Sequence, residues 1–199
     1  MTYLIIGVSA LIVVILIAYY EQNLWWRKYK AKPHNFQFKH KGKKLWHSRA
    51  CAVASFIFNQ SDNGEWFVLA NQRGRGVPQF KNFWNCPCGF VDYNESTVDA
   101  AYRETKEECG VAIPKGAFQL YGINSDPIDS VDQTIAIRYY VKLSSDMVSI
   151  VDLVPYVTNE GEKDEVTDAR WIPISEIDKY RWAFNHDKII KEIYETKIK

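Results

Sequence analysis

The chain has 199 residues, 47% of them hydrophobic and 15% aromatic, which is enough for one medium domain with a packed core and an appendage. Its formal net charge of +1 conceals an uneven distribution, because residues 21–49 carry nine Lys/Arg and one acid, Glu21. The other 16 basic and 23 acidic residues give residues 50–199 a formal charge of −7, which argues against nucleic-acid binding and suits a cation-dependent site.

Residues 3–20 are uncharged and consist mostly of Ile, Leu and Val. As an α-helix they would be about 27 Å long, close to the hydrocarbon thickness of a bilayer. Aromatic residues stand at the C-terminal end, as in an interfacial belt: Tyr19, Tyr20, Trp25 and Trp26. A secretory signal peptide would need a basic start and a small-residue cleavage site, and neither is present. We therefore expect residues 1–20 to be an uncleaved, single-pass transmembrane anchor.

Nine basic residues between positions 27 and 49 follow this segment. The positive-inside rule then predicts that the N-terminus is outside and that the following domain is cytoplasmic. We expect residues 21–48 to be a basic juxtamembrane linker, either solvated or lying against anionic headgroups.

Four cysteines should be free thiols in a reducing cytoplasm: Cys51, Cys86, Cys88 and Cys109. The pair Cys86-Pro-Cys88 has no second Cys or His pair at zinc-finger spacing. Packed or loop thiols are therefore favoured over a structural zinc site.

The rest of the chain is predicted to form strands and helices in the order strand–strand–helix–strands–helix. Residues 50–59 and 65–71 are strand-like and flank the turn Ser-Asp-Asn-Gly, so we predict a hairpin, and residues 72–83 predict a loop. Apolar residues recur at helical spacing over residues 96–109, with Ser96 or a neighbour as cap and Gly110 beyond the end. Strands at 118–123, 134–143 and 169–173, an acidic loop at 160–168 and a terminal helix at 183–198 complete the chain. This order predicts an α+β fold with helices packed on a mixed sheet.

The predicted helix carries a cluster of carboxylates. Glu104, Glu107 and Glu108 share one face because they are three or four residues apart. Like charges so placed repel, and a hard divalent cation such as Mg²⁺ or Mn²⁺ removes that penalty. Arg103 is four residues before Glu107 and can orient it, and Glu95 could add a ligand. The alternative is a solvated acidic face with Arg103 as an ion-pair partner.

The full stretch from Gly89 to Val111 resembles the Nudix box, Gly-x5-Glu-x7-Arg-Glu-aliphatic-x-Glu-Glu-x-Gly-aliphatic. It departs from that pattern only at Thr105, where an aliphatic residue is usual. Residues 83–89 resemble the segment that leads into the box, with Cys88 where a glycine is common, and residues 170–173 resemble the late part of the domain. The resemblance implies a Nudix-type α/β/α sandwich over residues 49–199.

The resemblance also implies a reaction, the Mg²⁺-dependent hydrolysis of a nucleoside diphosphate linked to another group, with Mn²⁺ as an alternative ion. Glu104 and Glu108 would be the main metal ligands, and Glu107 would be a ligand or the base that activates water. Arg103 would orient Glu107. The cage would be completed by Glu95 and the Gly89 carbonyl.

Two further groups are candidates from the same resemblance. Some Nudix enzymes take a catalytic carboxylate from a late loop, where this chain offers Glu160, Glu162 and Glu165. Arg73 and Arg75, in the predicted glycine-containing loop, could contact substrate phosphates or be surface charges.

The substrate is less sharply indicated. Residues 182–190 resemble the ending of bacterial ADP-ribose pyrophosphatase-like Nudix proteins, which would place His186 or Phe184 near the substrate; alternatively, Asn185 caps a helix and Phe184 joins the core. ADP-ribose or another nucleotide sugar is favoured, and nucleoside triphosphates, NADH and capped RNA stay open. A non-catalytic Nudix binding module and an isopentenyl-diphosphate isomerase-like enzyme using Cys86 are the alternatives in other classes. A nucleic-acid partner is not expected, and a homodimer is left open.

Overall fold

The computed structural model describes residues 16, 17, 19, 36–126, 133–143, 154–157 and 164–199. The chain forms two compact units, Met1–Ser48 and Arg49–Lys199. Most of the expected anchor lies outside the described residues, apart from Leu16, Ile17 and Tyr19. In the part of the chain that is described, no helix has both the length and the apolar character needed to cross a membrane.

A β-hairpin occupies the end of the first unit. Strands β1 (Phe36–His40) and β2 (Lys43–His47) pair antiparallel. The pairing of His40 with Lys43 leaves a two-residue turn, in which Lys41 and Gly42 have φ values of 47° and 78°. Two successive positive φ values are typical of the tight turns that match strand twist. These two strands of residues 36–47 were not predicted, because their short turn lies within a tract dense in lysines.

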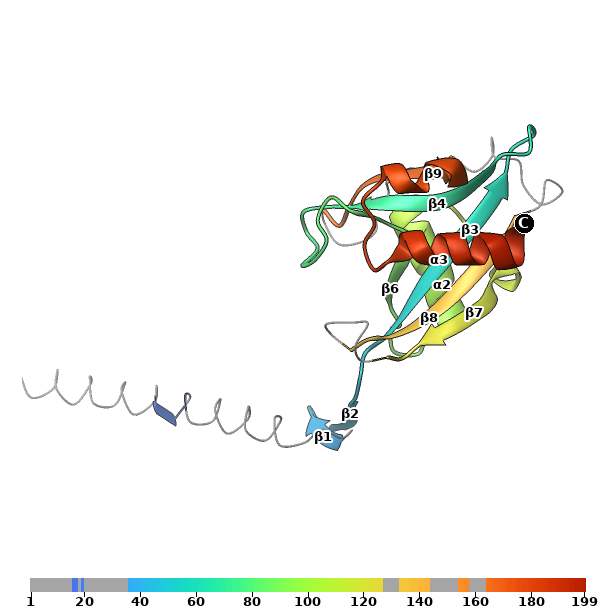
Figure 1. Ribbon diagram of the computed structural model, residues 1–199. Helices are drawn as coiled ribbons and strands as arrows, with labels where there is room; N and C mark the ends of the chain where they lie inside the picture. The colour runs from blue at the N-terminus through green and yellow to red at the C-terminus, as the bar shows by residue number, and fades with distance from the viewer. Residues whose placement is uncertain (1–15, 18, 20–35, 127–132, 144–153, 158–163) are drawn as a thin grey trace, which may run out of the picture. The chain divides into compact units, whose positions relative to one another are not determined.

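The second unit is built on a seven-stranded mixed sheet (Figure 1). Strand β3 lies at its centre, pairs antiparallel with β4 and β6, and pairs parallel with β8. Strand β4 also pairs antiparallel with β5 and β9, and β7 pairs antiparallel with β8. The strands are β3 (Cys51–Gln60), β4 (Trp66–Arg73), β5 (Trp84–Asn85), β6 (Cys88–Phe90), β7 (Gln119–Asn124), β8 (Ile135–Lys142) and β9 (Val166–Pro173).

Most of the predicted strands are confirmed, including the hairpin of β3 and β4. Strands β5 and β6 were not predicted, because runs of two and three residues are too short to show alternation. Strand β9 begins at Val166, inside the predicted acidic loop. Pairing with β4 extends it, so tertiary contact outweighs the polar local composition.

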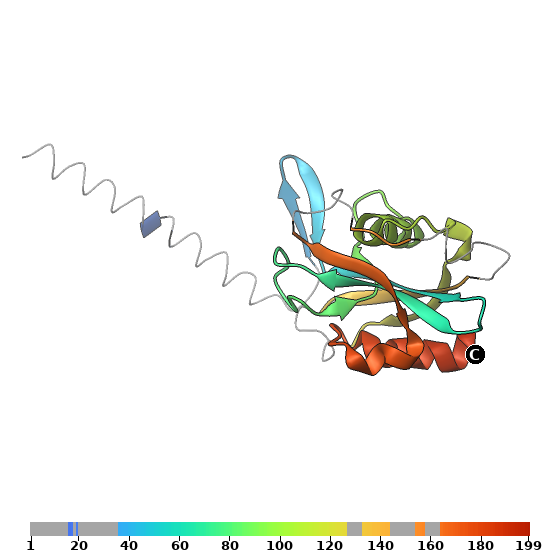
Figure 2. The same cartoon turned by 90° about the horizontal axis from the view of Figure 1, so that it is seen from above.

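The sheet is covered by one helix on each face (Figure 2). Helix α2 (Thr97–Cys109) packs on one side, and helix α3 (His186–Ile193), continued by a π-helical turn (Tyr194–Ile198), packs on the other. Short 3₁₀ turns lie at Lys115–Ala117 and Ile174–Lys179. The predicted α/β/α sandwich is confirmed.

Alternation along β3 divides the core into two layers. Val53 and Ile57 belong to the cluster that contains the buried face of α2, whereas Phe56 and Phe58 belong to the cluster that contains α3. Successive side chains of a strand point to opposite faces, so both faces of a central strand can be apolar. Helix α2 is thus held against the sheet from Ala100 to Cys109.

The ends of α2 are set by local hydrogen bonds. The Ser96 hydroxyl accepts from the Asp99 amide at 3.1 Å, and Gly110 ends the helix with φ 68°. Thr105 is fully buried, but its Oγ1 donates to the Ala101 carbonyl at 2.7 Å. That bond satisfies the hydroxyl, which explains why a polar residue is tolerated at a position where an aliphatic one is expected.

Candidate active site

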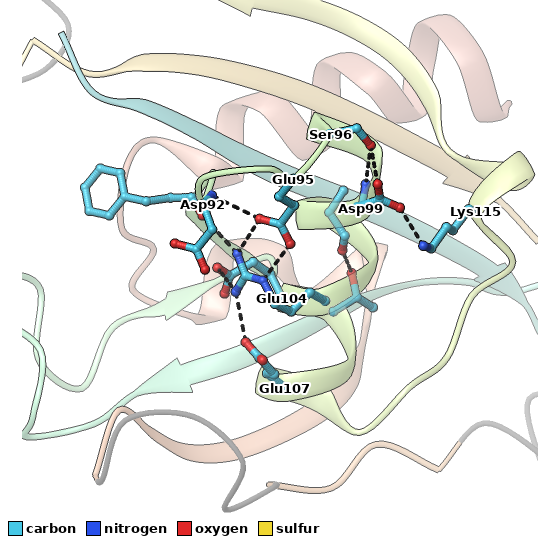
Figure 3. Close-up of polar contacts among 11 residues, drawn as sticks. Asp92, Glu95, Ser96, Asp99, Glu104, Glu107 and Lys115 are labelled. Carbon is cyan, nitrogen blue, oxygen red and sulfur yellow. Dashed lines mark hydrogen bonds and ion pairs between the residues drawn. The ribbon is translucent and has the colours of Figure 1, made fainter. Parts of the chain in front are cut away.

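Arg103 joins three carboxylates on the exposed side of α2. Its Nε lies 2.8 Å from Oε1 of Glu95, and its Nη1 lies 2.7 Å from Oε1 of Glu104 and 3.0 Å from Oε2 of Glu107. Figure 3 shows Glu95 in the loop before the helix, Glu104 in the middle of the helix and Glu107 in its last turn. The contact predicted between Arg103 and Glu107 is present.

The pair formed by Arg103 and Glu95 is bidentate. Arg103 Nη2 donates to Oε2 of Glu95 and to the Phe90 carbonyl, each at 3.0 Å. These hydrogen bonds lower the pKa of Glu95 and raise the pKa of Arg103, so both are charged at neutral pH. The arginine therefore ties the loop before α2 to the helix itself.

Glu108 is the most deeply buried carboxylate of the box, with 4% of its surface exposed. Its Oε2 accepts from Asn71 Nδ2 at 2.7 Å and from the Cys88 amide at 2.9 Å. Burial raises the pKa of Glu108 well above its usual value, the charge of Glu104 adds to this, and the two donors oppose it. Asn71 was not predicted as a site residue. The only hint in the sequence was one polar amide residue at the end of a run of apolar residues.

Glu104 lies beside Glu108 and is only slightly more exposed, with 12% of its side-chain surface accessible. Burial raises its pKa from 4.5 to about 7; Arg103 opposes the rise, whereas Glu107 and Glu165 add to it. Burial therefore favours the neutral forms of Glu104 and Glu108, and ionising both would create more buried negative charge than one arginine balances. A bound cation would stabilise the ionised forms.

Gly89 allows the Glu104 carboxylate to approach strand β6. It pairs with Val53 of β3, and a Cβ at this position would lie 2.1 Å from Glu104 Oε1. No side chain larger than hydrogen fits there without moving the carboxylate. The first glycine of the box and its first helical glutamate are therefore in direct contact.

The donor set suits a hard divalent cation such as Mg²⁺ or Mn²⁺, because it consists of carboxylate and carbonyl oxygens. Across residues 36–126, 133–143, 154–157 and 164–199, however, no group of three or more His, Cys, Asp or Glu side chains is arranged to hold a metal ion. Glu95, Glu104 and Glu107 bond Arg103 in this arrangement. Binding a cation would therefore require some of these carboxylates to exchange contacts with Arg103 for contacts with the ion.

Glu165 reaches the site from the segment before β9. Its carbonyl accepts from the Gly74 amide at 2.6 Å, and the Asp164 carbonyl accepts from the Gly76 amide at 2.9 Å. A Cβ at Gly74 would lie 2.0 Å from the Asp164 carbonyl oxygen, so the glycine allows this close approach. Burial raises the pKa of both Glu104 and Glu108, and the charge of Glu165 adds to each rise, so Glu165 lies near enough to act on the cluster. The other two candidates, Glu160 and Glu162, lie outside the described residues.

The two candidate arginines differ in their surroundings, because Arg73 is the last residue of β4 and Arg75 lies in the loop that follows. Arg73 is half-buried, its Nε donates to the Gln79 carbonyl at 3.2 Å, and its guanidinium lies 4.9 Å from the centre of the Phe184 ring. Burial raises the pKa of Cys88, and the charge of Arg73 opposes that rise, so Arg73 lies near the box. Arg75 is exposed to solvent.

The start of α3 is only partly as predicted. Asn185 occupies the cap position but makes no side-chain capping bond, and Phe184 is 41% exposed rather than in the core. His186 is buried, and its Nδ1 accepts from the Cys86 amide at 3.0 Å. Burial lowers the pKa of His186 to about 3, so it is a neutral structural acceptor.

The cysteines are all free thiols. Cys86 is fully buried, and burial raises its pKa well above the usual value. A nucleophilic cysteine needs a lowered pKa and access to substrate. The environment of Cys86 therefore removes the reason for comparing the chain with the isomerase.

Comparison with known proteins identifies the family. A family model for the NUDIX domain matches residues 48–193. The chain belongs to the Nudix family. The Nudix box predicted at Gly89–Val111 lies inside the matched region, on β6, the following loop and α2.

One curated Nudix relative is the ADP-ribose pyrophosphatase of Methanocaldococcus jannaschii, which is 33% identical over 114 residues. The match covers 57% of this chain and 58% of that protein. The matched region is thus less than two thirds of that relative's length.

Solved structures show the same Nudix fold. The NUDIX domain of Shewanella oneidensis NrtR complexed with ADP ribose has a TM-score of 0.62 at 19% identity, covering 79% of this chain and 92% of that chain. A bifunctional NMN adenylyltransferase/ADP ribose pyrophosphatase from Francisella tularensis, complexed with AMP and an Mn ion, has a TM-score of 0.58 at 20% identity. The latter match covers 86% of this chain and 45% of that chain.

Proposed function

We propose that this Nudix protein is a Mg²⁺-dependent hydrolase that cleaves the diphosphate bond of a nucleoside diphosphate linked to another group. The observation that carries the proposal is the buried pair Glu104 and Glu108, with Arg103 bonded to Glu104 and the charge of Glu165 acting on both carboxyls. Such a cluster is unfavourable without a cation. ADP-ribose is the favoured substrate, because the curated relative is named for it and the NrtR domain was solved with it.

The proposed roles follow the positions of the side chains. Glu104 and Glu108 would hold Mg²⁺, with Glu95 and the Gly89 carbonyl as further donors. The ion would offset the negative charge of the diphosphate and lower the pKa of a coordinated water. Glu107 is more exposed than Glu104, so it is placed to act as a ligand or to accept the proton of the attacking water.

Two more groups have supporting roles in the proposal. Arg103 positions Glu95 and Glu107 through its hydrogen bonds. Glu165 is the alternative proton acceptor, because its charge acts on the same cluster from another segment.

The test is hydrolysis by the purified full-length protein with Mg²⁺ and a panel of diphosphates, followed by ³¹P NMR. ADP-ribose should yield AMP and ribose 5-phosphate. Glu108→Gln should lower kcat by about 100-fold or more while the protein stays folded, because Gln keeps the shape of the side chain and removes its charge. The matched control is Glu195→Gln, which changes an exposed carboxylate on the π-helical turn and should retain full activity.

The same panel separates the other candidate functions. Release of inorganic diphosphate from nucleoside triphosphates would favour a triphosphate pyrophosphohydrolase. Binding of ADP-ribose without turnover would indicate a Nudix binding module, and isomerised prenyl diphosphate would indicate the isomerase. Full activity of Glu108→Gln would refute the proposed mechanism.

We further propose that residues 3–20 anchor the protein in a membrane as a single pass, with the Nudix domain cytoplasmic. The support is the uncharged stretch itself and the nine basic residues that follow it. Release of the protein from membranes by alkaline carbonate would contradict the anchor. The sequence leaves a homodimer open, and sedimentation velocity of the detergent-solubilised chain would decide the oligomeric state.

A further inference from the structure

One buried asparagine donates a hydrogen bond to the most deeply buried carboxylate of the box. Asn71 lies on β4 with 0% of its surface exposed, and its Nδ2 lies 2.7 Å from Oε2 of Glu108. The three residues before it in the strand, Val68, Leu69 and Ala70, are buried and apolar. Asn71 is therefore a polar side chain at a position where the strand otherwise supplies core.

The side-chain amide of Asn71 is only partly satisfied. Its Oδ1 is buried and has no hydrogen-bond partner among residues 36–126, 133–143, 154–157 and 164–199. A buried polar atom without a partner lowers stability, and an apolar residue of similar shape would avoid that cost. Folding stability alone thus does not account for an asparagine here, whereas the need for an N–H donor to Glu108 does.

The two donors to Glu108 are held by separate parts of the sheet. The backbone of Asn71 lies opposite Asn85 of β5 on one side and opposite strand β9 on the other. Cys88 pairs with Ala54 of β3, and its amide donates to the same Oε2 at 2.9 Å. Both donors therefore fall on one oxygen of Glu108, which leaves Oε1 as the oxygen that can take a cation.

We propose that Asn71 is a positioning residue, which holds Oε2 of Glu108 so that Oε1 is presented to the divalent cation. Hydrogen-bond partners behind a metal ligand fix its orientation, and their loss typically costs about 10–100-fold in metal affinity or activity. This inference rests on the proposed function, because it assigns a role toward the same Mg²⁺ site. Asn71 lies outside the stretch from Gly89 to Val111, so the box pattern does not assign it.

Mn²⁺ binding tests this role without turnover. The full-length, detergent-solubilised protein is titrated with Mn²⁺, and the free ion is measured by its EPR signal. Asn71→Leu removes the donor at similar side-chain volume and should raise the Kd for Mn²⁺ by about ten-fold or more. Its urea midpoint in metal-free buffer should stay close to that of wild type, because loss of the hydrogen bond is offset by removal of the unpartnered carbonyl.

A second variant and a kinetic measurement guard against a packing artefact. Asn71→Val, a smaller residue that suits a strand, should weaken Mn²⁺ binding to a similar extent. In hydrolysis, the Mg²⁺ concentration that gives half the maximal rate should rise by the same factor in both variants. KM for ADP-ribose at saturating Mg²⁺ should not change, since Asn71 acts on the metal ligand and not on the substrate.

Asn59→Leu is the matched control. Asn59 is 1% exposed on β3, pairs with Phe67, and has an Nδ2 without a hydrogen-bond partner in the described part of the chain. This change should leave the Kd for Mn²⁺ as in wild type.

The outcomes separate the positioning role from the proposed hydrolase. Unchanged Mn²⁺ affinity in both Asn71 variants, equal weakening in Asn59→Leu, or a loss that matches the unfolded fraction would overturn the role. Weakened Mn²⁺ binding in the Asn71 variants without hydrolysis of any diphosphate by wild type would support the role and refute the hydrolase. Hydrolysis by wild type with a Mn²⁺ affinity that is insensitive to Asn71 would do the reverse.

Discussion

Gly89→Ala places one methyl group against the carboxylate that is proposed to hold the metal. The new Cβ would lie 2.1 Å from Glu104 Oε1, whereas ordinary contact begins at 3.4 Å, so the carboxylate must withdraw by about 1.3 Å. Metal ligands tolerate errors of only about 0.2 Å, and a displacement of about 1 Å can cost about 100-fold in rate. We expect kcat/KM for ADP-ribose to fall by about 100-fold and the Mg²⁺ requirement to rise.

Stability should change little in this variant. The clashing atom is the end of a flexible side chain, and Gly89 does not have a positive φ, so alanine suits its backbone. The fall in kcat/KM should therefore occur without a fall in the urea midpoint.

The measurement is steady-state hydrolysis over a Mg²⁺ series, with urea unfolding of the same preparations. Gly122→Ala is the matched control, because it also lies in a strand and its Cβ would meet nothing within 4 Å. Gly122→Ala should keep wild-type activity. Wild-type kcat/KM in Gly89→Ala would refute the contact between Gly89 and Glu104 as a constraint on catalysis, and so would a loss fully explained by unfolding.

Two further predictions concern the pH dependence of folding in metal-free buffer. Burial raises the pKa of Glu104 from 4.5 to about 7, so this group favours the folded state below pH 4.5 and the contribution is lost as the pH rises through 7. Glu104→Gln should therefore gain stability relative to wild type between pH 5 and pH 8, by at most about 3 kcal/mol in urea unfolding; a constant difference would contradict this. The contribution of His186 to folding stability has the opposite pH dependence, because burial lowers its pKa from 6.5 to about 3. That contribution is complete above pH 6.5 and is lost as the pH falls toward 3. His186→Asn, which can still accept from the Cys86 amide, should flatten the loss of stability between pH 6 and pH 4, and parallel curves for the two proteins would rule out this role.

Features with a local cause were predictable from the sequence. Helix α2 follows from apolar spacing and from its capping residues, Ser96 and Gly110. The contact between Arg103 and Glu107 follows from their separation of four residues on that helix. The hairpin of β3 and β4 follows from a strong turn between two apolar runs.

Features that depend on distant partners were missed or misassigned. Asn71 is 37 residues from Glu108, and nothing in an apolar strand marks it as a carboxylate partner. Phe184 was predicted to lie either in the core or near the substrate, and the folded chain leaves it 41% exposed with its ring against that of Phe80. The hairpin β1–β2 escaped prediction because its turn is short and lies within a basic tract.

The sequence by itself determined the Nudix box, the helix that carries it and the identities of the carboxylates, because helical spacing is a property of neighbours along the chain. The tertiary structure decided how buried those carboxylates are and which groups face them. Packing of α2 on the sheet buries Glu108 and brings β6 within contact of Glu104 through Gly89, and the segment before β9 adds Glu165. Burial and long-range approach depend on the whole fold, and they convert an acidic helix face into a site that favours a cation.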